Sequence, residues 1–150
     1  DFLVTKPNRD KPTSVQVKMS RDYRPNAAST TFDEGQLAGG WFTFNHEKLA
    51  KSTADMWSLI LVSRERRSKP SFINISPQDL LSCLVDVFGE KKRYQSYPWV
   101  LQFKKGTRPT CVEGRGLKKA DKEKLANGKC IEPLARDLTQ YYDDWSAFEN

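Results

Sequence analysis

One uncharged apolar run, Met56 to Val62, constrains the fold more than any other feature of the sequence. It is far shorter than the roughly 20 residues that a membrane-spanning helix needs. It also lacks the alternation of apolar and polar residues that is typical of a half-buried strand. Burial on both faces explains this pattern, so the run predicts a strand inside a sheet that other elements cover.

The segments on either side of this run predict further strands and helices. Ser71 to Ile75 alternates as a strand does. Ser76 followed by Pro77 is typical of a helix start, and the apolar residues after it, Leu80 among them, fall on one helical stripe. Upstream, Asn45 is a good N-cap, so we expect a helix over residues 45–55.

The N-terminal residues predict a hairpin. Residues 2–5 form a short apolar run, and a polar segment rich in turn residues follows it. Residues 14–19 then alternate, with Gln16 and Lys18 on one face of the expected strand. In a tight pairing of the two strands, we expect Asp1 beside Gln16 and Lys18.

The remaining segments complete the expected fold, a single α/β domain over residues 1–150 with a mixed central sheet flanked by helices. Residues 21–40 are expected to be a long irregular loop. The other expectations are strands at 98–103 and 110–112, a helix over 118–127 that ends at Gly128, a terminal helix over 134–148, and core positions for Trp41, Trp57 and Trp99.

Positive charge is concentrated in the middle of the chain. The formal net charge is +6, and residues 61–119 carry thirteen Lys and Arg against five Asp and Glu. Such a field attracts phosphate backbones, of DNA or of RNA; the alternative is solvated loops whose charge serves solubility. The candidate phosphate-binding residues form two clusters, Arg64, Arg66, Arg67 and Lys69, and Lys91, Lys92 and Arg93.

Asp1, Gln16 and Lys18 are the best candidates for chemistry. A carboxylate and an amide oxygen are ligands that suit a hard cation such as Mg²⁺. A lysine beside them can orient a metal-bound water or neutralise charge on a phosphate. The single histidine, His46, has no partner at a spacing typical of a catalytic triad and is expected at the surface or at a helix cap.

These residues and their order resemble the core of the PD-(D/E)XK nucleases. The resemblance covers residues 1–88 and rests on Asp1-Phe2-Leu3-Val4 and on Val15-Gln16-Val17-Lys18-Met19-Ser20, which is similar to the Gln-x-Lys variant of Mrr-like and restriction enzymes. It implies a restriction-endonuclease-like fold with its site on the hairpin strands. Asp1 and Gln16 would bind the metal, Mg²⁺ or also Mn²⁺, and Lys18 would be the catalytic lysine.

The resemblance further implies a DNA endonuclease of restriction or repair type, and a homodimer, since many such nucleases cut two strands as dimers. The family usually places a helix before the aspartate, so we expect either a fragment that lacks this helix or an Asp1 that is merely terminal. Gln16 is neutral where the family often has an acid. This favours the alternative, a non-catalytic nucleic-acid-binding or interaction domain with a degenerate nuclease fold.

The cysteine count and the hydropathy indicate the compartment. Three cysteines cannot form a complete set of internal disulfides, and their spacing matches no CxxC metal pair. Neither a signal peptide nor a membrane span is predicted from the sequence. We therefore expect reduced thiols in a cytoplasmic protein, nucleoid-associated if the source is bacterial, with no membrane partner.

Overall fold

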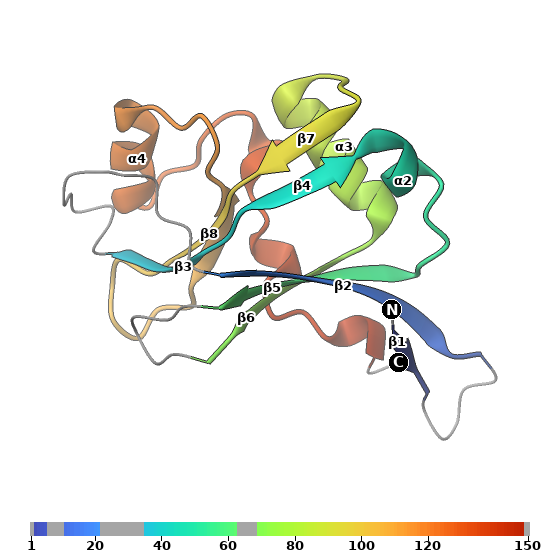
Figure 1. Ribbon diagram of the computed structural model, residues 1–150. Coiled ribbons are helices and arrows are strands. Elements are labelled where there is room, and N and C mark those ends of the chain that lie inside the picture. The colour runs from blue at the N-terminus through green and yellow to red at the C-terminus, as the bar shows by residue number, and fades with distance from the viewer. Residues whose placement is uncertain (1, 6–10, 22–34, 63–68, 149–150) are drawn as a thin grey trace.

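A mixed four-stranded sheet is the central element of the computed structural model, which describes residues 2–5, 11–21, 35–62 and 69–148 (Figure 1). Its strand order is β1 (Phe2–Val4), β2 (Thr13–Arg21), β5 (Met56–Val62) and β6 (Ser71–Ile75). β1 and β2 form the predicted antiparallel hairpin, whereas β5 pairs parallel with β2 and antiparallel with β6. The predicted class, a single α/β domain with a mixed sheet, is confirmed.

β5 is the buried strand that its uncharged run predicts. Trp57, Leu59 and Leu61 are buried on one face of the strand, and Met56 and Ser58 are buried on the other. Burial on both faces removes the need for a polar side, which explains the absence of alternation in the sequence.

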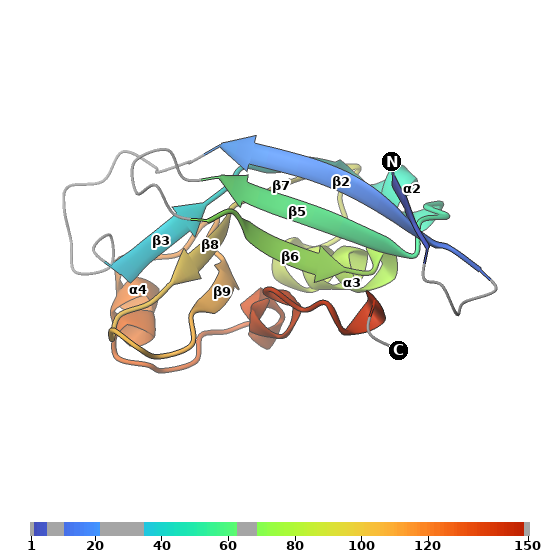
Figure 2. The same ribbon diagram turned by 90° about the horizontal axis from the view of Figure 1, so that it is seen from below.

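Two smaller sheets and three helices complete the described architecture. β3, β8 and β9 form one sheet, and β4 pairs with β7 in a two-stranded ribbon. Figure 1 shows β4, β7, α2 and α3 on one side of the four-stranded sheet, and Figure 2 shows its opposite side facing the viewer. The bounds are β3 Gln36–Gly39, β4 Phe42–Asn45, α2 His46–Ala50, α3 Pro77–Phe88, β7 Arg93–Ser96, β8 Pro98–Leu101, β9 Thr110–Glu113 and α4 Lys119–Ala126.

The main core fills the space between the sheet and this layer. Leu59 and Ile73 from the sheet pack with Leu80 and Leu84 of α3, and each of the four is at most 3% exposed. Trp99 and Val112 belong to a second cluster, against which Leu125 of α4 packs. The stripe predicted for the helix after Pro77 is therefore the face that seals the main core.

Capping residues define the helix starts as predicted. Ser76 Oγ accepts the Asp79 N–H at 3.0 Å, and Asn45 Oδ1 accepts the Lys48 N–H at 3.0 Å. α2 ends at Ala50, earlier than expected, because the chain then has to reach β5, where the Asp55 N–H donates to Ser14 O at 3.1 Å. α4 ends close to Gly128, whose φ of 71° suits glycine.

The terminal helix expected over 134–148 is wrong. The segment instead forms short 3-10 turns at Leu134–Arg136, Thr139–Tyr141 and Ser146–Phe148. Its backbone donors are used elsewhere: Leu138 N–H donates to Cys111 O at 2.8 Å, and Asp143 N–H donates to Phe72 O at 2.9 Å. Hydrogen bonds to the edges of β9 and β6 have replaced those of a helix.

Two further expectations need correction. Trp41 is 50% exposed and is not a core residue, whereas Trp57 and Trp99 are buried as predicted. The stretch expected to be irregular, 21–40, contains β3, and its residues 22–34 lie outside the described residues. No helix formed by the described residues is long and apolar enough to cross a membrane.

Candidate functional site

Gln16 and Lys18 lie on the same face of β2, as the alternation predicts. In the parallel ladder Gln16 is paired with Trp57 and Lys18 with Leu59, so both polar residues share the face that carries the main core. Both are half-buried. They extend this core face toward the hairpin, at the point where buried apolar packing gives way to an open hollow.

The predicted site residues differ in how far the structure describes them. Asp1, Arg64, Arg66 and Arg67 lie outside the described residues. Asp1 directly precedes Phe2, whose Cα is paired with Val15 across the hairpin. The role of Asp1 as a metal ligand therefore stays a prediction from the sequence.

The basic residues that are described fall in different places. Lys69 is exposed, precedes β6, and does not line either hollow that contains Lys18. Arg93 begins β7, which pairs with β4, and it lines a hollow together with Lys18. Lys91 and Lys92 line a separate hollow of 520 Å³ with His46, Glu47 and Glu90, where the charges are of both signs.

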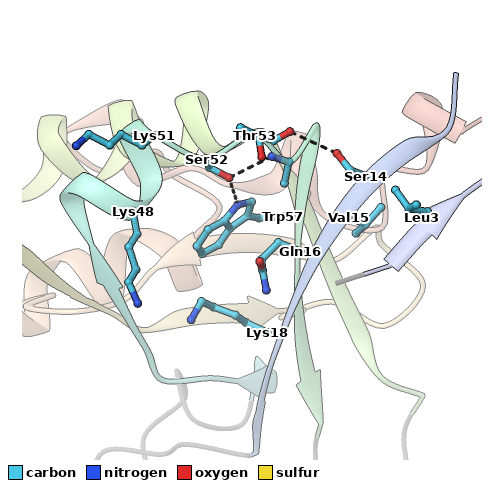
Figure 3. A pocket seen from close by; sticks show the side chains of 11 residues that line it. Leu3, Ser14, Val15, Gln16, Lys18, Lys48, Lys51, Ser52, Thr53 and Trp57 are labelled. Carbon is cyan, nitrogen blue, oxygen red and sulfur yellow. Dashed lines mark hydrogen bonds between the residues drawn. The ribbon is translucent and has the colours of Figure 1, made fainter.

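The hollow in front of Gln16 has a volume of 680 Å³, and we refer to it as the Gln16 hollow (Figure 3). Side chains from β2, from α2 and from the segment leading into β5 line it. Among the described residues, neither Asp nor Glu is part of its lining. The polar and charged lining residues are Ser14, Gln16, Lys18, Lys48, Lys51, Ser52 and Thr53.

Lysines give this hollow its charge. Figure 3 shows Lys48 reaching down from α2 toward Gln16 and Lys18. Within the described part of the chain, one lysine of this hollow forms an ion pair: Lys51 Nζ lies 2.6 Å from Glu47 Oε1. Lys18 and Lys48 therefore present positive charge that no described carboxylate neutralises, which favours an anionic ligand.

Two aromatic rings hold the Lys18 ammonium. Its Nζ lies 5.5 Å from the ring centroid of Trp57 and 5.9 Å from that of Phe44, distances at which cation–π attraction acts. The indole is fixed in turn, because Trp57 Nε1 donates to Ser52 Oγ at 3.0 Å. The orientation of the lysine is thus determined by buried aromatic packing.

Ser14 and Asp55 fix the start of β2 against β5. Both the N–H and the hydroxyl of Ser14 donate to Asp55 Oδ2 at 2.8 Å. These hydrogen bonds from Ser14, the backbone one first, hold the pKa of the Asp55 carboxyl below its usual range. This clamp sets the register that places Gln16 beside Trp57.

The described residues do not complete a metal site. They contain no group of three or more His, Cys, Asp and Glu that could hold a metal ion. Gln16 supplies one neutral amide oxygen, whereas Mg²⁺ is usually bound through at least one carboxylate. The carboxylate assigned to the metal is that of Asp1, so the fit of Mg²⁺ depends on that residue.

His46 is a structural residue of the helix start. Its Nδ1 lies 3.1 Å from the hydroxyl of Tyr94, and the two rings stack with centroids 6.1 Å apart. The same hydroxyl accepts the Lys91 N–H at 3.2 Å. His46 joins α2 to β7 and does not line the Gln16 hollow; it is the half-buried first residue of α2, next to the cap residue Asn45.

Sequence reasoning missed Lys48 as a site residue. The cap at Asn45 predicts the helix that carries it, but nothing local predicts that this helix brings Lys48 into the same hollow as Gln16 and Lys18. Arg93 was predicted as a phosphate-binding residue, but its place beside Lys18 was not, because it depends on the pairing of β7 with β4.

Comparisons with family models, curated proteins and solved structures found no match for this chain.

Proposed function

We propose that this domain is a metal-dependent nuclease that hydrolyses phosphodiester bonds of DNA. The observation that carries the proposal is that Gln16 and Lys18 lie on the same face of β2 and line a hollow of 680 Å³. Lysines line this hollow, and no described carboxylate does. A positively charged hollow of this kind suits a phosphate backbone. The resemblance of the hairpin sequence to the PD-(D/E)XK nucleases supports the same class.

Each residue then has a distinct role. The Lys18 ammonium, held by Trp57 and Phe44, would neutralise charge on the scissile phosphate or orient the attacking water. Lys48 would contact the same phosphate group from α2. Asp1 and Gln16 would hold Mg²⁺ or Mn²⁺, which when bound lowers the pKa of a water and polarises the phosphoryl group.

A second candidate is a nucleic-acid-binding domain without catalysis. It is favoured by the neutral amide at position 16 and by the lack, among the described residues, of a cluster of metal-binding side chains. Its charged hollow would still bind a phosphate backbone. A homodimer and a cytoplasmic location remain predictions from the sequence under both candidates.

Cleavage of supercoiled plasmid separates the two candidates. The chain is incubated with plasmid in Mg²⁺, in Mn²⁺ or in EDTA, beside Lys18→Ala and Lys18→Arg, with a single-stranded RNA as a parallel substrate. Lys104→Ala is the charge-matched control, because the exposed Lys104 lines neither hollow that contains Lys18.

The nuclease proposal expects metal-dependent cutting that Lys18→Ala abolishes and Lys104→Ala retains. Binding of DNA should weaken by no more than about tenfold in Lys18→Ala, because only one of many positive charges is lost. Full activity of Lys18→Ala would show that the site is misplaced. Salt-sensitive binding without cutting would instead support the non-catalytic domain.

A further inference from the structure

A second hollow adjoins the Gln16 hollow on the far side of Lys18. It has a volume of 400 Å³, and we call it the Arg93 hollow. Lys18, Lys48 and Trp57 line both hollows, so the two are contiguous across these side chains. Gln16 belongs only to the first hollow and Arg93 only to the second.

The polar side chains of the Arg93 hollow can all donate hydrogen bonds. Lys18, Lys48 and Arg93 are cations, and Thr43 contributes a hydroxyl. The side-chain oxygen of Asn45 already accepts the Lys48 N–H, so the amide nitrogen is the donor left to a ligand. Among the described residues no Asp or Glu lines this hollow, so its chemistry suits an anion and not a metal ion.

Regular pairing holds these donors in place. Asn45 and Arg93 are direct partners in the β4–β7 ladder, so they project from the same face of the ribbon. Both are exposed, as is Thr43. Phe44, which lies between Thr43 and Asn45 in β4, is buried in the main core. The donors are therefore presented by a ribbon that the core anchors, and they need no rearrangement to meet a ligand.

We propose that the Arg93 hollow binds the phosphate next to the scissile one in the same nucleic-acid strand. This inference rests on the proposed function, because it takes the Gln16 hollow as the place of cleavage. Two neighbouring phosphodiesters carry one negative charge each, and both would face the shared pair Lys18 and Lys48. Arg93 supplies the additional cation, and its planar guanidinium can bind two phosphate oxygens at once.

Binding in the absence of metal tests this subsite independently of cleavage. The probe is a short fluorescein-labelled DNA duplex, and its affinity is measured by anisotropy in EDTA over a series of salt concentrations. The variants are Arg93→Gln, which removes the charge, and Arg93→Lys, which keeps it. Lys104→Ala again controls for the loss of one surface charge, and circular dichroism checks that each variant folds.

We expect Arg93→Gln to weaken binding by about tenfold and to reduce the slope of log affinity against log salt by about one. Arg93→Lys should keep most of the slope but lose part of the affinity, because it cannot bind two oxygens in one plane. Lys104→Ala should change neither quantity appreciably.

The outcomes distinguish this inference from the proposed function. If Arg93→Gln binds as tightly as the unaltered chain, with the same slope, the subsite is wrong and the nuclease proposal is untouched. If the unaltered chain binds no DNA, both fail. If Arg93→Gln weakens binding but plasmid is never cut, a phosphate site at Arg93 stands, whereas catalysis is refuted and with it the assignment of a neighbouring scissile phosphate.

Discussion

The ammonium of Lys18 lies 5.5 Å from the centroid of the Trp57 ring, and these two residues come from neighbouring parallel strands. The indole is buried and hydrogen-bonded through its ring nitrogen, so it cannot turn away without breaking that bond. The lysine is consequently pre-oriented toward the hollow before any ligand arrives. Pre-orientation of this kind lowers the cost of forming a charged transition state.

Replacing Trp57 should therefore lower activity beyond its effect on stability. Trp57→Leu removes a cation–π contact worth about 0.5–2 kcal/mol, which corresponds to a loss in cleavage rate of about 2- to 30-fold. Trp57→Phe keeps a ring and should retain most of the rate. The measurements are plasmid cleavage under conditions where each variant is folded, together with denaturant unfolding.

Trp99 provides the matched control for this prediction. It is equally buried and has the ammonium of Lys122 5.5 Å from its ring, but it belongs to the second cluster. Trp99→Leu should destabilise the fold to a similar degree and leave the cleavage rate of the folded protein unchanged. Equal losses of rate in the two leucine variants would argue against orientation of Lys18 by Trp57.

A carboxylate at position 16 should strengthen metal binding. In Gln16→Glu the new side chain keeps nearly the same shape and adds a negative charge, which a hard cation prefers over an amide. We expect the Mg²⁺ concentration for half-maximal cleavage to fall by about tenfold, equivalent to about 1.4 kcal/mol. Gln140→Glu, an exposed change of the same chemistry, is the control. An unchanged metal requirement in Gln16→Glu would remove Gln16 from the metal site.

The buried carboxylate of Glu113 should make the fold less stable as the pH rises. Burial raises the pKa of Glu113 above its ordinary value of 4.5, although hydrogen bonds from Ser96, Tyr97 and Arg115 oppose the shift. Between pH 4.5 and the folded-state pKa, the folded protein holds a proton that the unfolded chain has lost, so the free energy of unfolding falls across this window.

Glu113→Gln should remove that pH dependence without disturbing the packing. Glu113 Oε1 accepts the Tyr97 N–H at 2.8 Å and the Arg115 N–H at 2.9 Å, and an amide oxygen can accept both. The amide nitrogen can then donate to the hydroxyl of Ser96. Glu113→Ala, which leaves these donors without an acceptor, should cost about 2–4 kcal/mol. Urea unfolding from pH 4 to 8 checks both variants, and a pH profile in Glu113→Gln equal to that of the unaltered chain would contradict the assignment.

The three cysteines should differ sharply in reactivity. Cys130 is exposed, whereas burial raises the pKa of the half-buried Cys83 thiol to about 11 and raises that of Cys111 further. Because the thiolate is the reactive form, a disulfide reagent at pH 8 should modify one thiol rapidly in the folded protein and three in guanidinium. Cys130→Ser should lose the rapid phase; if the phase persists, another cysteine is accessible.

Local sequence patterns predicted the parts of the site that a single strand determines. Alternation alone places Gln16 and Lys18 on one face, and Ser76-Pro77 marks the start of α3. The Arg93 hollow has no such local signal. β7 contains one large buried side chain, Tyr94, in an otherwise polar segment, and its strand exists because β4 pairs with it. The helix predicted over 134–148 was wrong because hydrogen bonds to distant strands override the helical pattern of this segment.

The Ser14–Asp55 clamp joins residues 41 positions apart, and this separation has a consequence for how the domain assembles. A parallel pair of strands with so long a connection must close a large loop before its contacts repay the lost chain entropy. The strands β3 and β4 and the helix α2 lie within that connection, so Lys48 reaches the Gln16 hollow only when the connection folds. Lys18, Trp57 and α2 therefore come together only in the cooperative folding transition, and a partly folded chain would contain no part of the Gln16 hollow.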